Sequence, residues 1–417
     1  MGKKYELLLK NGYIFPVNRV MDLGIRDGKI IELKEHLEEL DAEHVINISG
    51  QTVSPGFVDS HIHMEKALTA DEDDTTNLQD ACIRSENRTR EMYDGWSEDA
   101  VLEDIVARAS RVIEMCIANG TTAVKNQVLI TGSWGMLALD AMDILKEKYQ
   151  DRITIKAVVP YYEVLDSEWQ EAARQKRIDA IGGCPNREIG GRDGHSRYTL
   201  EYRKTVDRIF ALAKEYNLPI DLHVDESDSA NVDLFEYVVH KTFQEHMEGR
   251  VTCSHVTGLA AKKIDEEYVA DVLAWAAKAR VRVTTMTSCD MYLMDIGRRG
   301  PTRVRQMLDV GIDVSIASDN IRDAYRPFGN GDLLEEALLT AEVHKLFTKA
   351  KLAHIAKMIT LYPAENMLLE NYGIRPGCDA DLVVLDAPNM QEAILSQADK
   401  TYVLKGGKIV AKSGKLV

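Results

Sequence analysis

The feature that most constrains this chain of 417 residues is a regular alternation of short apolar, β-branched runs with longer helical patterns. Strands that alternate with helices favour a parallel sheet, and eight repeats favour a closed barrel over an open, doubly wound sheet. The predicted fold class is therefore α/β, with a (β/α)8 TIM-like barrel. The eight runs are residues 52–63, 121–130, 153–160, 180–184, 220–224, 251–255, 281–286 and 312–318.

The clearest helical pattern covers residues 98–118, where apolar side chains recur at helical spacing. Ser97 can cap the start of this helix, and Gly120 can end it. By contrast, the stretch 66–96 is charged and shows little apolar pattern. Because that stretch is too long for a plain connection, we interpret it as a loop over the mouth of the barrel.

The two ends of the chain show a different pattern, in which short strands are joined by turn signals. Residues 11–12 (Asn-Gly) and 27–28 (Asp-Gly) are hairpin signals, and residues 406–407 (Gly-Gly) separate two short strands. Two β-rich ends around a different middle predict that the ends pair with each other. The expected domains are a small β-sandwich built from residues 1–55 plus 373–417, and the barrel, built from residues 56–372.

Charge and composition restrict the partners of the chain. Lys and Arg number 51 against 67 Asp and Glu, and the resulting formal charge of −16 repels phosphate backbones and argues against nucleic acid. No window of 18 apolar residues exists, so we expect no membrane-spanning helix. The start lacks the apolar core of a signal peptide, and the six cysteines form no C-x-x-C pair. We expect a cytoplasmic location, a small-molecule substrate and a homo-oligomer.

Ligand-type side chains stand at the ends of four of the eight runs, and barrel enzymes place their catalytic groups at the carboxyl ends of strands. One strand-end histidine can be a simple polar cap. Five such groups at four ends indicate a metal or catalytic site, and imidazole with carboxylate suits zinc or iron. The five residues are His61, His63, His223, His255 and Asp319.

Glu226 lies just past the fifth run, three residues after His223. An arbitrary loop glutamate is as often a surface acid as a functional one. A carboxylate beside a metal-bound water, however, can take a proton from that water and pass it to a substrate. The neighbouring ligand-type residues therefore favour a catalytic interpretation of Glu226.

Several segments of this sequence resemble one known family. Residues 55–63 (PGFVDSHIH) resemble the first-strand signature of the amidohydrolase superfamily, and residues 373–386 resemble its C-terminal signature. Other segments are similar to the subgroup that contains cytosine deaminase and N-isopropylammelide amidohydrolase. These are residues 223–226 (HVDE), 254–255 (SH), 298–304 (RRGPTRV), 317–323 (ASDNIRD) and 327–332 (PFGNGD).

The resemblance implies one divalent metal ion, zinc or iron, held by His61, His63, His223 and Asp319. It also implies catalytic roles for three residues: Glu226 as proton shuttle, Asp319 in moving a proton to the leaving amine, and His255 in stabilising the oxygen of the tetrahedral intermediate. Lys125 lies in the second strand and does not take the place of the bridging lysine in binuclear members. The implied reaction is hydrolytic deamination of an amino-substituted nitrogen heterocycle, with release of ammonia or a small amine.

The sequence departs from the subgroup around the substrate. The glutamine that grips the ring after strand three is absent, and Tyr162 and Glu163 stand in that region; Gln127 replaces a histidine of strand two. An ionised Glu163 only accepts hydrogen bonds, so it would suit a ring edge that presents N–H groups. We expect substrate contacts from Tyr162, Glu163, Asn320 and Tyr325, and cytosine to be a poorer substrate than for true cytosine deaminases.

Two alternative functions remain open on the sequence. A cyclic amide hydrolase, similar to hydantoinase or dihydropyrimidinase, would share the barrel, but such relatives usually need the bridging lysine. A non-catalytic binding protein of amidohydrolase fold would be free to lose ligands, whereas all five ligand-type residues are retained here. The candidate rings are a cytosine-like pyrimidine, an aminotriazine or a related heterocycle.

Overall fold

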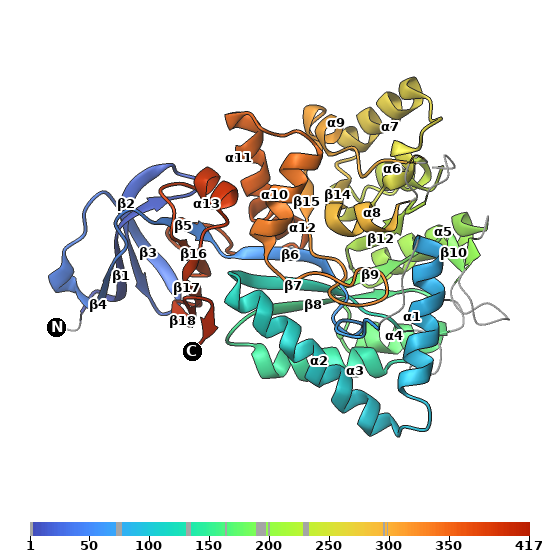
Figure 1. The fold of residues 1–417 in the computed structure, drawn as a ribbon, viewed down its shortest axis with the longest axis horizontal. Helices are drawn as coiled ribbons and strands as arrows, with labels where there is room; N and C mark the ends of the chain where they lie inside the picture. The colour runs from blue at the N-terminus through green and yellow to red at the C-terminus, as the bar shows by residue number, and fades with distance from the viewer. Residues whose placement is uncertain are drawn as a thin grey trace.

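The computed structural model describes residues 3–71, 77–130, 135–162, 165–188, 197–198, 201–227, 233–294, 297 and 299–417. The described chain forms a barrel and, beside it, a separate sheet built from both chain ends (Figure 1). The N- and C-termini both lie at this sheet, on the far side from the carboxyl ends of the barrel strands. The carboxyl end of the barrel therefore faces away from the sheet of chain ends.

The barrel is a parallel sheet of eight strands, as the alternation in the sequence predicts. The first and last strands, β6 and β15, are joined by a bridge between Ile62 and Asp319, which lies just past β15. The backbone N–H of Asp319 donates to the carbonyl of His61 (2.9 Å), and that of His63 donates to the carbonyl of Asp319 (3.2 Å). The strands are β6 (Phe57–Ile62), β7 (Thr121–Gln127), β8 (Thr154–Pro160), β9 (Ala180–Gly183), β12 (Ile220–Val224), β13 (Val251–His255), β14 (Arg282–Thr285) and β15 (Val314–Ile316).

Helices connect and cover these strands (Figure 1). Among the helices that the structure describes, none is long and apolar enough to cross a membrane. They include α2 (Glu98–Ala118), α3 (Leu137–Tyr149), α4 (Asp166–Arg174), α5 (Tyr202–Glu215), α6 (Asp233–Gln244), α7 (Glu266–Lys278), α8 (Thr287–Leu293), α9 (Val304–Asp309), α10 (Leu333–Val343), α11 (Lys349–Met358), α12 (Leu361–Asn366) and α13 (Met390–Ser396).

Helix α2 has the bounds that its apolar spacing predicts. The Ser97 side chain accepts a hydrogen bond from the backbone N–H of Ala100, which satisfies one of the donors that every helix start leaves unpaired. After the C-cap at Asn119, Gly120 takes a left-handed φ of +94°, and its N–H donates to the carbonyl of Ile117. Both predicted ends of this helix are confirmed.

Residues 78–92 of the stretch 66–96 form a helix, so the interpretation of this part as a loop is wrong, although its expected place at the mouth of the barrel agrees with the structure. This helix is α1 (Leu78–Met92), which stands at the carboxyl end of the barrel (Figure 1). Only a narrow stripe of this helix is buried: Leu78, Ala81, Cys82 and Ser85. That stripe packs against residues of α8 and the end of the eighth strand, so a tertiary contact stabilises a helix whose own pattern is weak.

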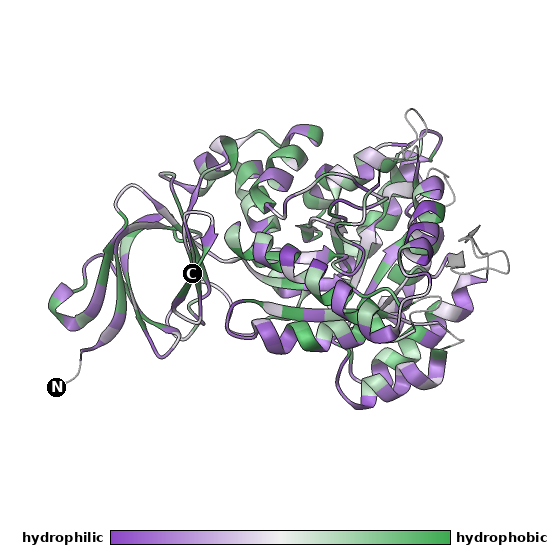
Figure 2. Cartoon of the chain, turned by 60° about the horizontal axis from the view of Figure 1, so that its bottom comes forward, coloured by the Kyte–Doolittle hydropathy of each residue, from purple (hydrophilic) through white to green (hydrophobic). Residues whose placement is uncertain are grey.

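The chain ends form one continuous nine-stranded sheet, in which β5 pairs antiparallel with β16 and so joins the N-terminal strands to the C-terminal ones. The sheet is curved (Figure 2) and encloses its own apolar core, which includes Leu9, Leu23, Val53 and Leu404. The strands in order are β19 (Lys415–Leu416), β18 (Lys408–Lys412), β17 (Lys400–Lys405), β16 (Leu382–Leu385), β5 (Thr52–Pro55), β1 (Tyr5–Ile14), β2 (Arg19–Arg26) and β3 (Lys29–Lys34), with β4 (Ala42–Asn47) also paired to β1.

Residues 27–28 and 406–407 form the two hairpin turns that their sequences predict, with positive φ at all four positions. The prediction for Asn11-Gly12 is wrong, because β1 continues through both residues. The pairing register with β2 shifts between Leu9 and Gly12, and Asn11 has φ 61°, so the pair forms a bulge rather than a turn. A Cβ at Gly12 would lie 2.6 Å from the Ile48 side chain, so close packing also requires the glycine.

The barrel interior contains a buried ion pair rather than an all-apolar core. The Lys125 ammonium on β7 pairs with Asp221 on β12, and it also donates to the side-chain carbonyl of Asn366 on α12. All three side chains are buried. Removing one partner of such a pair leaves an uncompensated charge in a medium of low polarity, which is strongly destabilising.

We predict that Lys125→Met lowers the free energy of unfolding by about 3–5 kcal/mol, because it leaves the Asp221 carboxylate buried without its cation. Urea unfolding of the purified variant measures this loss. Lys204→Met is the matched control, since Lys204 pairs with Glu201 at the exposed surface; its unfolding midpoint should stay near that of the wild type. Equal midpoints for the two variants would contradict the prediction.

Candidate active site

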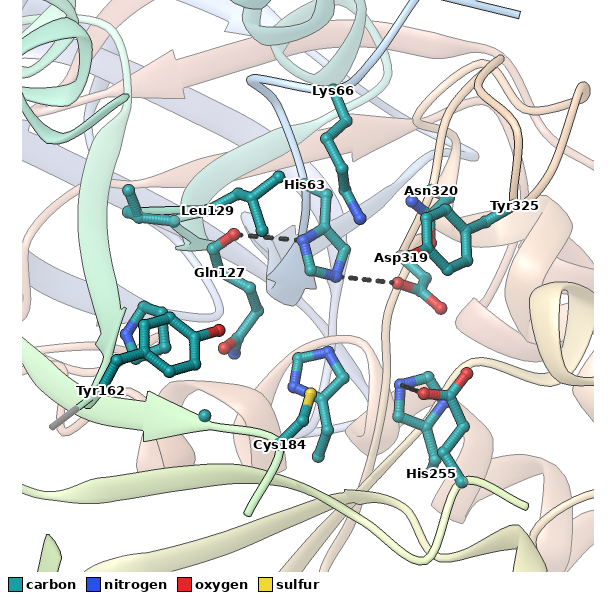
Figure 3. Close-up of a pocket in the computed structure, with 15 residues that line it drawn as sticks. His63, Lys66, Gln127, Leu129, Tyr162, Cys184, His255, Asp319, Asn320 and Tyr325 are labelled. Atoms are coloured by element: carbon teal, nitrogen blue, oxygen red, sulfur yellow. Dashed lines mark hydrogen bonds and ion pairs between the residues drawn. The ribbon is translucent and has the colours of Figure 1, made fainter. Parts of the chain in front are cut away.

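A cavity opens at the carboxyl end of the barrel (Figure 3). The residues that line it come from the ends of strands that are distant in sequence. They are His63, Lys66, Gln127, Val128, Leu129, Pro160, Tyr162, Gly183, Cys184, His223, Glu226, His255, Asp319, Asn320 and Tyr325. Most of the residues singled out from the sequence therefore face one cavity.

His61 and His63 lie at the end of β6, and both point towards the Asp319 carboxylate. The Nε2 atoms of His61 and His63 lie 3.7 Å and 3.5 Å from Asp319 Oδ1. His61 is fully buried at the base of the cavity, while His63 reaches its wall. The backbone bonds that close the barrel position all three side chains, because they join the segment 61–63 directly to residue 319.

Four imidazole rings converge beside this carboxylate. The ring centroid of His61 lies 5.3 Å from that of His63, 4.6 Å from that of His223 and 5.5 Å from that of His255. Nitrogen or oxygen atoms of two overlapping sets lie within 4.8 Å of one another, a spacing that one metal ion can bridge. The sets are His61, His223 and His255, and His61, His63 and Asp319.

Hydrogen bonds fix the tautomers of His61 and His63 so that their Nε2 lone pairs face this cluster. The hydroxyl of Ser254 donates to Asp221 Oδ1 (3.1 Å), so its oxygen accepts from the Nδ1–H of His61 (3.0 Å). His63 Nδ1–H donates to the backbone carbonyl of Gln127 (3.1 Å). Outer partners of this kind are typical of metal-bound histidines.

The nitrogen and oxygen atoms of this cluster have the environment that a divalent cation needs. Among the described residues, no hydrogen bond reaches His61 Nε2 or Asp319 Oδ1, although both atoms are buried. Burial, together with neighbouring cationic groups, lowers the pKa values of His61 and His63 well below the ordinary range, so both rings are neutral and have a free lone pair. Burial also raises the pKa of Asp319 to about 7, and Glu226 adds to this effect while His255 opposes it.

His255 is held by a carboxylate that the sequence analysis did not identify. Its Nδ1–H donates to Asp290 Oδ1 on α8 (2.9 Å), and its Nε2 lies 3.8 Å from Glu226 Oε2. Burial opposes the charge on this ring, but Glu226 and Asp290 outweigh burial and raise the pKa of His255 to about 9. Thr302 adds a second support, because its hydroxyl donates to the His255 carbonyl (2.6 Å). The ring is therefore a fixed, cationic hydrogen-bond donor.

Glu226 follows β12 and lines the cavity together with His63, His223 and His255. Its side chain is 8% exposed, so little water competes for its carboxylate. The cavity can thus present a base, Glu226, and a cationic donor, His255, to a single bound molecule. Proton transfer to and from a heterocycle needs this combination of groups.

Three of the four residues expected to contact substrate line the cavity: Tyr162, Asn320 and Tyr325. The fourth, Glu163, lies outside the described residues. Asn320 is oriented by its neighbour, because its Nδ2 donates to the buried carboxylate of Asp323 (2.6 Å). The backbone N–H groups of Tyr325 and Arg326 donate to the other oxygen of Asp323, which fixes the loop that carries all four residues.

Lys66 and Cys184 also line the cavity but were not predicted as site residues, and Asp290 supports the site from outside it. Asp290 stands five residues past β14, at a strand end like the predicted ligands, so the same positional argument could have found it. Lys66 follows the His-x-His motif by three residues. No spacing rule indicates that a lysine there turns into the cavity.

Comparison with known proteins places the chain among enzymes of one family. Residues 152–411 match the family model described as "Amidohydrolase family". The chain is 31% identical over 424 residues to an N-isopropylammelide isopropyl amidohydrolase of Pseudomonas sp. (strain ADP), with 100% of both chains covered. It is 26% identical to a pterin deaminase of Rhizobium rhizogenes, covering 87% of this chain and 81% of that protein.

The fold has close solved counterparts. The structure of a 5-methylcytosine deaminase from Klebsiella pneumoniae, liganded with 5-fluorocytosine, superposes with a TM-score of 0.83 at 24% identity and covers 97% of each chain. At this identity the likeness concerns the fold: the barrel and the sheet of chain ends recur together over nearly the whole length.

We predict that Ser254→Ala weakens divalent-metal binding about 10- to 100-fold, because it removes the oxygen that keeps His61 in its Nδ1–H tautomer. Competition for zinc with a chromophoric chelator measures the change in dissociation constant. Ser110→Ala on α2 is the control, since the Ser110 hydroxyl accepts a hydrogen bond from Lys148 and Ser110 is not among the residues that line the cavity. An unchanged zinc affinity in Ser254→Ala would show that Ser254 does not orient the ring.

Proposed function

Since the chain belongs to the amidohydrolase family, whose members hydrolyse C–N bonds, we propose that it is a metal-dependent deaminase of amino-substituted nitrogen heterocycles. The reaction would be hydrolytic and would release ammonia or a small amine. The observation that carries this proposal is that Glu226 and His255 line one cavity with His63, His223 and Asp319. The full-length similarity to an amidohydrolase of N-isopropylammelide and the similarity to a pterin deaminase support the substrate class.

The residues that would hold the metal are His61, His63, His223 and Asp319, as the resemblance implies. Their imidazole nitrogens and carboxylate oxygens suit one divalent ion, zinc or iron. Such an ion supplies Lewis acidity and lowers the pKa of a water molecule that it coordinates. Metal binding is typical of the family to which this chain belongs.

In the proposed reaction, Glu226 accepts a proton from the attacking water and delivers it to the ring nitrogen of the substrate. Asp319 assists the transfer of the second proton to the leaving amine. His255 donates from Nε2 to the oxygen that develops negative charge, and Asp290 keeps the ring charged and oriented for this contact. Because these groups are set before substrate arrives, little reorganisation is needed during the reaction.

The ring would lie between the protein's aromatic and amide side chains. Tyr325 and Tyr162 offer aromatic faces to a planar heterocycle, and Asn320 offers a polar contact whose direction Asp323 fixes. These contacts are part of the proposal, as is the expectation that Glu163 takes part.

The alternative of cyclic amide hydrolysis finds no support in the geometry. Lys125, the lysine of strand two, is engaged by Asp221 and Asn366 in the barrel interior and is not among the residues that line the cavity. A second metal ion held through this lysine would require that ion pair to break. We therefore keep deamination as the single proposed function.

We predict that metal removal abolishes activity. The protein loaded with zinc or with ferrous iron should release ammonia or an amine from at least one ring in a panel of aminopyrimidines, pterins, creatinine-like rings and aminotriazines. Treatment with a chelator should stop the release, and added metal should restore it. If no ring in the panel reacts while the protein carries one equivalent of metal, the proposed reaction is wrong.

We predict that Glu226→Gln retains the metal but loses about 10²–10⁴-fold in turnover, because the amide has the same shape and cannot carry the proton. Steady-state kinetics with the best ring of the panel, together with metal analysis, measures both effects. Glu267→Gln on the exposed face of α7 is the control and should keep the wild-type rate. A wild-type rate in Glu226→Gln would show that another group moves the proton.

A further inference from the structure

Lys66 is a buried cation at the cavity that the proposed mechanism does not use. Its side chain enters the cavity from above His63, and its ammonium lies 4.1 Å from the ring centroid of Tyr325 (Figure 3). The residue is only 5% exposed. Within the described part of the chain, no hydrogen bond or ion pair reaches its Nζ atom, so its three donors have no protein acceptor.

Such a group needs an explanation, because lysine is almost never buried unless it is paired. The aromatic face of Tyr325 compensates part of the charge, but it accepts none of the three N–H donors in the way an oxygen does. The ammonium is therefore directed at an acceptor that the described residues do not supply.

Two of the buried carboxylates near this position, those of Glu65 and Asp323, are already engaged by other groups, and no ion pair among the described residues joins Lys66 to the third, Asp319. Both oxygens of Glu65 are occupied: one accepts from Asn126 Nδ2 (2.9 Å) and the other from the backbone N–H of Leu129 (3.0 Å). Asp323 accepts from the side chain of Asn320 and from the backbone of its own loop. Within the described ranges, Lys66 is thus not one half of a structural ion pair.

The position of Lys66 defines one side of the cavity. Lys66, Asn320 and Tyr325 lie together in Figure 3, whereas Tyr162 and Cys184 lie across from them. An ammonium beside an aromatic face presents positive charge and hydrogen-bond donors to whatever ring edge comes there. A substrate ring that fits here carries hydrogen-bond acceptors on the edge that faces Lys66. An ionised oxygen is the acceptor that a buried ammonium favours most.

We propose that Lys66 binds an anionic oxygen of the substrate, so that the site selects heterocycles bearing an acidic oxo or hydroxyl group that is ionised at neutral pH. This inference rests on the proposed function, since it names the substrate class of the same site. It distinguishes acidic rings, in which the scissile amine and an ionised oxygen share one ring, from neutral aminopyrimidines. The charge of Lys66 compensates the charge that such a ring brings into the cavity.

Two rings of the same size test the inference without turnover. Barbiturate is an anion at neutral pH, and uracil is neutral. Calorimetric titration of the metal-loaded protein should show tighter binding of barbiturate. In Lys66→Met the preference for barbiturate over uracil should fall about 10- to 100-fold, the range expected for a lost charge-assisted hydrogen bond. The affinity for uracil should change by less than about threefold.

The comparison isolates Lys66 from the metal, because the metal attracts the anion equally in the wild type and in the variant. Lys66→Gln is measured in parallel, so the result does not depend on one variant remaining folded, and Lys66→Arg should keep most of the preference. Lys262→Met, at an exposed position away from the cavity lining, is the control and should keep all of it. Metal content and melting temperature are recorded for each protein.

An equal preference for barbiturate in the wild type, Lys66→Met and Lys66→Gln overturns the inference, as does a wild type that binds uracil as tightly as barbiturate. Failure of the proposed function has a different signature. If no ring releases ammonia but the preference still falls in the Lys66 variants, only the deaminase proposal fails. If deamination occurs and the preference does not move, only the role of Lys66 fails.

Discussion

The hydrogen bonds that close the barrel between the first and eighth strands are the constraint on which the candidate site depends. The carbonyl of His61 and the N–H of His63 both bond to the backbone of Asp319. These two hydrogen bonds place residues that are more than 250 positions apart in the chain side by side. They also place two imidazoles and a carboxylate close enough to bind one ion, because the side chains of His61, His63 and Asp319 extend from the residues that these backbone hydrogen bonds join. Without closure, these donor atoms would lie on opposite edges of an open sheet.

The polar groups of the barrel divide into those that the fold satisfies and those that it leaves for a ligand. Asp221, Ser254 and Asp290 are satisfied within the protein, and each fixes the direction of a histidine or a lysine. Asp319 Oδ1 and the Lys66 ammonium face the cavity with no hydrogen bond from the described residues. Burying a polar group without a partner is costly, so the second set marks where charge and binding capacity are concentrated.

Sequence-based prediction succeeded where a feature depends on residues close together in the sequence, and it failed where the feature depends on contacts between distant residues. The eight strands and α2 could be predicted because their apolar periods are local and strong. The ligand-type residues at strand ends could be predicted because barrel geometry brings all carboxyl ends to one face. Helix α1 could not, since its buried stripe is narrow and is stabilised by contact with α8. The bulge at Asn11 shows that one local signal, Asn-Gly, serves two backbone geometries, and pairing with β2 decides between them.

By itself, the sequence determined the barrel, the pairing of the chain ends and the convergence of four histidines with Asp319, because each of these follows from periodicity and from the fixed direction of parallel strands. Only the tertiary structure decided the tautomers of His61 and His63, the cationic state of His255 beside Asp290, and the entry of Lys66 into the cavity beside Tyr325. These features depend on which partner each polar atom finds across the fold. Such partners are separated by tens to hundreds of residues in the sequence. A local sequence pattern therefore does not predict which of them come into contact in the folded protein.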